Sequence, residues 1–205
     1  QLWATPHETS RIDVKGNLDA QTGTADSATI GIYDSQGNKH MIEISFTRNA
    51  ENQWDYEVTA TSPEDTIASG SNDSIYFDST GRIVSPTTAP SFTIDPSGGA
   101  GPFTVDIHLT EMTQFVTDES DVSIASQDGA PVGQLESFQI DSAGYIIGTY
   151  SNGILKRIGQ IALANAPNPE GLSKFQDTMF LESVSSGNVD SSGKAGESGL
   201  GTISS

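Results

Sequence analysis

Apolar and polar residues alternate along several stretches of this chain, and this period of two limits the fold more than any other feature. In residues 103–110, four apolar residues occupy every second position, so they share one face of an extended strand. A helix would need apolar residues three or four positions apart. The alternation therefore predicts strands with one buried face and an all-β fold. The core-facing sets are Ile42, Ile44 and Phe46; Trp54, Tyr56 and Val58; and Phe103, Val105, Ile107 and Leu109.

The sequence Asp-Ser-x-Gly follows an apolar residue three times, each time at the end of an apolar run. Asp accepts hydrogen bonds from the backbone ahead of it, Ser does so more weakly, and Gly adopts a positive φ without steric cost. The motif therefore predicts three hairpin turns, and Asn-Gly at 152–153 predicts a fourth. The turn residues are Asp34, Ser35 and Gly37; Asp78, Ser79 and Gly81; Asp141, Ser142 and Gly144; and Asn152 and Gly153.

The abundance of glycine and proline argues against long helices. The chain has 21 glycines and 9 prolines, and both residue types interrupt helices. The stretch 155–166 has apolar residues that would also fit a helix. Because it follows a Ser-Asn-Gly turn and contains Gly159, we predict a strand that returns from a hairpin.

The Asp-Ser-x-Gly motif lacks the spacing of the reactive sites that it resembles. A helix-loop-helix calcium loop needs glycine at position six and glutamate at position twelve. Here glycine is fourth, and the twelfth residue is Ser45, Ala89 or Asn152. A nucleophile elbow needs Gly-x-Ser-x-Gly before a helix, whereas these serines follow Asp. We therefore predict no catalytic residue, no cofactor and no metal ligand, with a looser carboxylate site left open.

The three histidines do not change this prediction. A catalytic triad would need one of His7, His40 and His108 beside a serine. His108 falls on the polar side of its alternating segment, and His40 stands beside a turn. All three are interpreted as ordinary surface histidines.

Composition excludes further classes of function. The chain has no cysteine, which excludes disulfides and thiolate metal sites. Its 27 acidic and 9 basic residues give a net charge of -18, which argues against nucleic acid as a partner, since phosphate binding needs clustered Lys and Arg. No apolar run has the length of a membrane span, so no membrane partner is expected.

Two weakly patterned segments, 18–27 and 116–133, interrupt the regular strands. Linkers at these places would enclose a strand-rich block. This arrangement predicts one domain inserted into another.

A more specific signal comes from six stretches of the chain: IYDSQGNKHMIEISF (32–46), NQWDY (52–56), MTQF (112–115), SFQIDSAGYIIGTYSNG (137–153), GQIALANAPNPEGL (159–172) and SGLGTI (198–203). These stretches resemble the bacterial flagellar hook protein family, and they run in the order of that family over nearly the whole chain. Related rod proteins share the later motifs, whereas the block at about 25–115 resembles the outer domain of hook proteins.

The resemblance implies an outer β-barrel or sandwich-like domain at 25–115, inserted into an inner β-domain made of 1–24 and 116–205. It also implies that the family's terminal helical segments lie outside this sequence. The implied protein is a structural subunit and not an enzyme. It would be exported through the flagellar secretion channel and polymerise with itself outside the cell into a curved tube, a universal joint that transmits torque from rod to filament.

The implied further partners are the hook cap, the distal rod and the hook-filament junction proteins. Two alternatives remain: a distal rod protein of the flagellar basal body, and an extracellular all-β adhesin or carbohydrate-binding module. The chain itself is expected to be monomeric.

Overall fold

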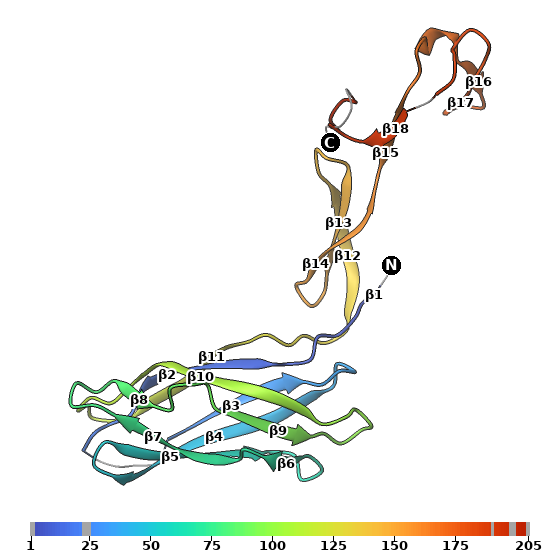
Figure 1. The fold of residues 1–205 in the computed structure, drawn as a ribbon. Coiled ribbons are helices and arrows are strands. Elements are labelled where there is room, and N and C mark those ends of the chain that lie inside the picture. The colour runs from blue at the N-terminus through green and yellow to red at the C-terminus, as the bar shows by residue number, and fades with distance from the viewer. Residues whose placement is uncertain (1–2, 22–25, 190, 197–199, 204–205) are drawn as a thin grey trace. The chain divides into compact units, whose positions relative to one another are not determined.

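The computed structural model describes residues 3–21, 26–189, 191–196 and 200–203 (Figure 1). Within these residues every regular element is a β-strand except the short 3-10 helix η1 (Pro169–Gly171), so the all-β prediction is confirmed. No helix in the described part is long and apolar enough to cross a membrane. The chain divides into two compact units. We call Thr5–Val132 the sandwich unit, and Gln1–Ala4 with Gly133–Ser205 the ribbon unit.

Two five-stranded sheets build the sandwich unit. The first has the order β11-β2-β10-β9-β6, with bounds β11 (Asp121–Gln127), β2 (Arg11–Asn17), β10 (Phe103–Thr113), β9 (Ser91–Asp95) and β6 (Thr66–Ser69). The second has the order β3-β4-β5-β7-β8, with bounds β3 (Asp26–Tyr33), β4 (Lys39–Ala50), β5 (Gln53–Ala60), β7 (Asn72–Phe77) and β8 (Ile83–Ser85). All pairs are antiparallel except β2 with β10, which are parallel.

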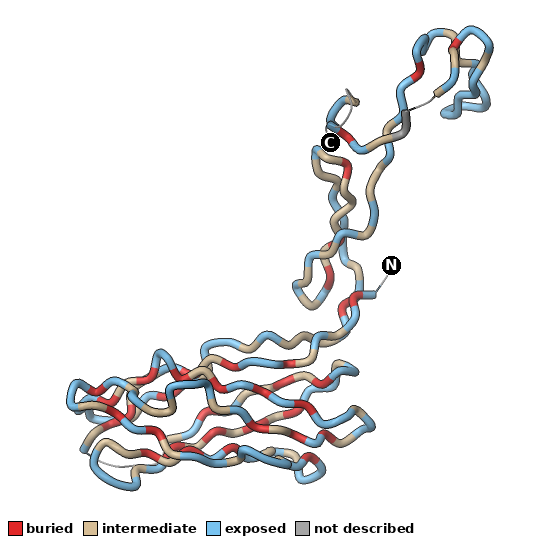
Figure 2. Tube along the Cα trace, in the orientation of Figure 1, coloured by how far each residue is buried: buried red, intermediate tan, exposed pale blue. Residues whose placement is uncertain are grey.

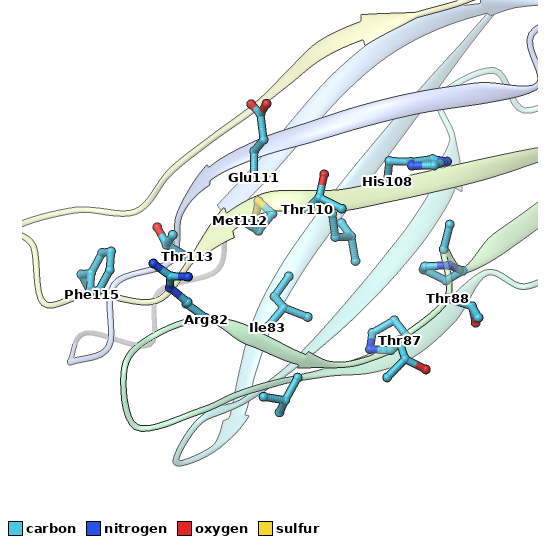
Figure 3. Close-up of a pocket in the computed structure, with 15 residues that line it drawn as sticks. Arg82, Ile83, Thr87, Thr88, His108, Thr110, Glu111, Met112, Thr113 and Phe115 are labelled. Atoms are coloured by element: carbon cyan, nitrogen blue, oxygen red, sulfur yellow. The ribbon is translucent and has the colours of Figure 1, made fainter.

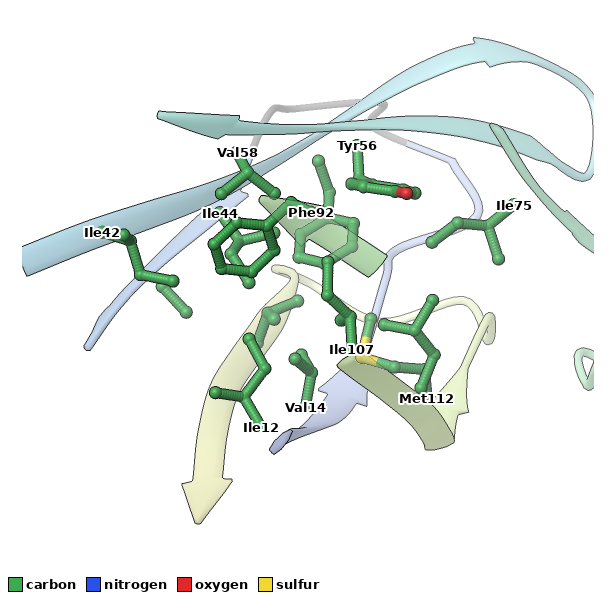
Figure 4. Close-up of a cluster of buried hydrophobic side chains, with 14 of the residues drawn as sticks. Ile12, Val14, Ile42, Ile44, Tyr56, Val58, Ile75, Phe92, Ile107 and Met112 are labelled. Atoms are coloured by element: carbon green, nitrogen blue, oxygen red, sulfur yellow. The ribbon is translucent and has the colours of Figure 1, made fainter. Parts of the chain in front are cut away.

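One buried apolar cluster contains side chains from both sheets (Figure 4). Every residue that the alternation assigned to the core is buried, including Trp54 and Tyr56, so these predictions are confirmed. Burying a large apolar side chain stabilises a fold by about 1.5–3 kcal/mol relative to leaving it exposed. The hydrophobic effect therefore holds the two sheets face to face.

The two units divide the chain at other positions than the sequence analysis expected. Strands β2 and β11 fall in the segments assigned to the inner domain, yet they pair with each other, and β2 pairs with β10. Both strands therefore complete the sandwich. The interpretation of 116–133 as a linker is wrong, because it contains β11, whose Val122 is buried. The acidic and serine residues around Val122 concealed that strand.

The ribbon unit consists of smaller sheets. One sheet has the order β1-β12-β13-β14, with bounds β1 (Trp3–Ala4), β12 (Gly133–Ile140), β13 (Tyr145–Tyr150) and β14 (Leu155–Gln160). Two further pairs are β15 (Ala162–Asn165) with β18 (Ser191–Lys194), and β16 (Ser173–Phe175) with β17 (Met179–Leu181). The prediction of strand structure at 155–166 is confirmed by β14 and β15.

Buried residues are concentrated in the sandwich unit (Figure 2). In the described part of the ribbon unit, the buried apolar residues are Ala4, Tyr150, Ala166 and Ala195. Phe138, Leu155 and Phe180 are 64%, 64% and 59% exposed. The described residues of the ribbon unit therefore leave much of its apolar surface uncovered.

Candidate functional site

The three Asp-Ser-x-Gly motifs form turns with the same hydrogen bonds. In each, Oδ1 of the aspartate accepts from the backbone N–H groups two and four residues ahead. The glycine N–H donates to the carbonyl oxygen of the same aspartate. The Oδ1 distances are 2.8 and 2.9 Å at Asp34, 2.8 and 3.0 Å at Asp78, and 3.0 and 2.9 Å at Asp141.

Glycine allows the positive φ that these turns need. The φ values are +86° at Gly37, +76° at Gly81 and +82° at Gly144. Ser35, Ser79 and Ser142 are exposed, and none of the hydrogen bonds that close the turns involves their hydroxyls. The aspartate and the glycine therefore shape each turn.

The Asn-Gly turn joins β13 to β14. Gly153 has a φ of +80°, and its N–H donates to the carbonyl of Tyr150 at 2.8 Å. Oδ1 of Asn152 accepts from the N–H of Ile154 at 3.2 Å. The chain thus reverses direction within one tight turn.

The turn at Asp34 differs from the other two because a buried histidine joins it. His40 lies between two aspartates, with Nε2 3.1 Å from Oδ2 of Asp34 and Nδ1 2.9 Å from Oδ2 of Asp65. Its residue exposure is 5%, and those of Asp34 and Asp65 are 0% and 6%. An ionised carboxylate only accepts hydrogen bonds, so with both aspartates ionised both ring nitrogens donate, and the ring is then an imidazolium.

The electrostatics of this cluster agree with that protonation state. Burial opposes the charge on each group, but hydrogen bonds outweigh it. For Asp34 the bonds from Asn38, His40 and the backbone hold the carboxyl pKa below its usual value. For Asp65 the bonds from Ser97 and His40 lower the pKa in the same way. The bonds and charges of both aspartates raise the pKa of His40 above its usual value.

The prediction of a surface position for His40 is therefore wrong. The signal was present in the alternation itself, because His40 is two residues before Ile42 on β4 and so shares its buried face. His7 is exposed and His108 is half-buried, as expected of surface residues. Among the described residues, no group of three or more His, Cys, Asp or Glu side chains is placed to hold a metal ion.

A groove of about 890 Å³ lies beside β8 and β10 (Figure 3). Its lining mixes apolar side chains such as Ile83 and Phe115 with Arg82, His108 and Glu111. Phe115 is half exposed. The hydroxyl groups of the lining belong to threonines, among them Thr110 and Thr113.

Comparisons with known proteins point to one family. The family described as "Flagellar basal body protein FlaE D2 domain" matches residues 5–130, nearly the whole sandwich unit. The flagellar hook protein FlgE of Escherichia coli is 31% identical over 175 residues, which cover 85% of this chain and 43% of the relative. That of Borreliella burgdorferi is 34% identical over 197 residues, with the same coverage of 85% and 43%.

A crystal structure of Helicobacter pylori flagellar hook protein FlgE2 is also similar, with 19% identity and a TM-score of 0.44 over 76% of this chain and 36% of that one. This chain spans less than half the length of these relatives. Since the family match covers more than half of the chain, the chain belongs to the family of the flagellar basal body protein FlaE D2 domain.

Proposed function

We propose that this chain is part of the structural subunit of the bacterial flagellar hook. In this proposal, copies polymerise outside the cell into a curved tube that transmits torque from rod to filament and bends as a universal joint. The observation that carries the proposal is the family match over the sandwich unit, extended by hook protein relatives that cover 85% of the chain.

The sandwich unit has the physical properties that such a joint needs. Its two sheets enclose their own core, so it behaves as a body that keeps its shape when its neighbours move. Polar, hydrated contacts between such bodies can rearrange at low cost, whereas dry apolar contacts resist sliding. Between Thr5 and Val132 the sequence has 20 acidic and 5 basic residues, a net charge of -15.

The ribbon unit supports a role in assembly in a different way. Its 7 acidic and 4 basic residues give a net charge of only -3. It also carries the exposed apolar residues Phe138, Leu155 and Phe180. Exposed apolar surface of this kind is typical of contact regions, and a helical polymer needs heterologous contacts that do not close into a ring.

The further partners in this proposal are the proteins at the two ends of such a tube. These are the distal rod at the base, the hook cap during growth, and the junction proteins that precede the filament. The motifs at 137–153 and 159–172, which related rod proteins share, support a common mode of stacking with the rod.

Immunogold electron microscopy tests the proposal. Antibodies raised against residues 5–132 should label only the short curved segment between cell body and filament. Preincubating the antibodies with the purified chain is the control, and it should abolish the labelling. Label confined to the basal body would favour a distal rod protein. Label spread over the cell surface would overturn the hook function and favour the adhesin.

A further inference from the structure

Three loops meet at one end of the sandwich unit around His40. They are the β3–β4 turn with Asp34, the loop that leads to β6 with Asp65, and the loop after β9 with Ser97. Residues of all three line one hollow of about 600 Å³. His40 joins the first loop to the second, and Asp65 joins the second to the third by accepting from the N–H of Ser97 at 2.7 Å.

We propose that His40, Asp34 and Asp65 form a pH-dependent clamp, which holds these loops together while His40 is protonated and releases the Asp65 side when His40 loses its proton. The inference rests on the geometry of the sandwich unit alone. It holds whether or not the chain is part of a hook.

Loss of one proton leaves the clamp with an unfavourable contact. Neutral imidazole has one N–H donor and one acceptor lone pair. One of the two buried carboxylates would then face that lone pair with no hydrogen between them. Such a contact between two acceptors in a buried site costs the hydrogen bond and adds repulsion.

The two aspartates are not held equally well, which decides the side that opens. Asp34 accepts from the backbone N–H groups of Gln36 and Asn38 and from Nδ2 of Asn38, all in its own turn. Asp65 is bonded through Oδ1 to Ser97, which lies on another loop. The turn keeps Asp34 in place, whereas the carboxylate of Asp65 can turn away from the ring and so loosen its hydrogen bond from the N–H of Ser97.

Few other charges face His40. Lys39 also lines the hollow, but it precedes His40 on β4 and its side chain crosses Gly31, where an added Cβ would meet Lys39 Cε at 1.9 Å. The other residues that line the hollow, which carry no charge, are Gln36, Asn38, Met41, Thr61, Ser62, Ser97 and Gly98. The two aspartates therefore dominate the field at the ring.

The sign of the pH dependence follows from linkage. A raised pKa of His40 stabilises the folded state fully below the ordinary histidine value of 6.5, and this contribution is lost as the pH rises through the folded-state pKa. Lowered pKa values of Asp34 and Asp65 stabilise above their ordinary value of 3.8, and this contribution is lost as the pH falls through their folded-state pKa values. The clamp is thus strongest between about pH 3.8 and 6.5.

Nitrogen-15 NMR of the histidine rings, combined with amide hydrogen exchange, tests the clamp. At pH 6.5 both ring nitrogens of His40 should show the shifts of an imidazolium. As the pH rises through the titration of His40, protection of the Ser97 amide should fall by about tenfold or more, after correction for the intrinsic rate. The amides of Gln36 and Asn38, which donate to Asp34, should keep their protection.

Two variants complete the test. His40→Gln cannot titrate, so the protection of Ser97 should no longer change between pH 6 and 9. His108→Gln, a substitution at a half-buried histidine outside the cluster, should keep the response of the unchanged protein. If His40→Gln does not fold, the pH titration of the unchanged protein still tests the proposal. A ring of His40 that is mostly neutral at pH 6.5, or Ser97 protection that ignores its titration, would overturn the proposal.

Discussion

The indole N–H of Trp54 donates a hydrogen bond of 2.9 Å to Oε1 of Gln114, and both residues are buried. Nε2 of Gln114 in turn donates to Oδ1 of Asn52 at 2.9 Å. Asn52 has a φ of +57° in the β4–β5 hairpin. The side-chain amide of Gln114, the residue after β10, therefore provides the acceptor for the buried indole and also bonds to the β4–β5 hairpin.

The first prediction concerns this amide. Gln114→Leu leaves the buried indole N–H without its acceptor, so we expect the free energy of unfolding to fall by about 1–3 kcal/mol. Urea denaturation followed by circular dichroism, a signal that does not depend on Trp54, measures the change. In a double-mutant cycle, Gln114→Leu should cost less in a Trp54→Phe background, which has no indole donor. Equal costs in both backgrounds would show that the hydrogen bond contributes nothing.

The second prediction concerns Gly37. A Cβ at this position would lie 2.9 Å from Cβ of Pro6 and 3.1 Å from the backbone nitrogen of Val132, at a φ of +86°. Gly37→Val should therefore destabilise the sandwich unit by about 1–3 kcal/mol in equilibrium denaturation. Gly101→Val is the matched control, because no atom lies within 4 Å of a Cβ there. Equal stabilities for the two variants would contradict the role of Gly37.

A third prediction separates Asp34 from its counterpart Asp78. Both shape the same kind of turn, but only Asp34 is bonded to His40. Asp34→Asn should lower the stability at pH 6 by about 1–3 kcal/mol. It should also flatten the loss of stability below about pH 3.8, because a lowered carboxyl pKa stabilises only above that range.

The control for this prediction is Asp78→Asn, which should change the stability at pH 6 less. Thermal unfolding of both variants between pH 2.5 and 7 makes the comparison. If stability falls with decreasing pH in Asp34→Asn just as it does in the unchanged protein, the carboxylate of Asp34 is not linked to folding.

A fourth prediction concerns the phenol of Tyr56. Burial, and then the charge of Asp73, raise its pKa to about 12. In a spectrophotometric titration at 295 nm, one phenol should therefore ionise only near pH 12. Tyr56→Phe should remove that step and no other. If the ionisation step that Tyr56→Phe removes lies well below pH 12, the burial of Tyr56 is contradicted.

The last prediction concerns the state of the chain in solution. A net charge of -18 opposes close approach of copies, so the chain is expected to sediment as a monomer at micromolar concentration and neutral pH. Sedimentation velocity measures this directly. A stable, discrete oligomer would contradict the expectation.

Much of the fold could be read from local patterns. The burial of Ile42, Trp54 and Phe103 follows from period two, because neighbouring side chains on a strand point to opposite faces. The turns at Asp34, Asp78 and Asp141 follow from contacts that reach only four residues along the chain. His40 was open to the same reasoning, but its polar side chain and its place beside a turn concealed its buried position.

Other features depend on contacts between residues far apart in the sequence. Asp106 pairs with Arg11 in the parallel strands β10 and β2. This pairing includes β2 in the sandwich unit, which therefore runs from Thr5 to Val132 and not over the predicted 25–115. Asp65 meets His40 across 25 positions. Strand periodicity says which face of a strand is buried but not which strand lies beside it. Which strands become neighbours depends on the packing free energy of the whole unit. That free energy comes from contacts between distant residues, which form only when the chain folds.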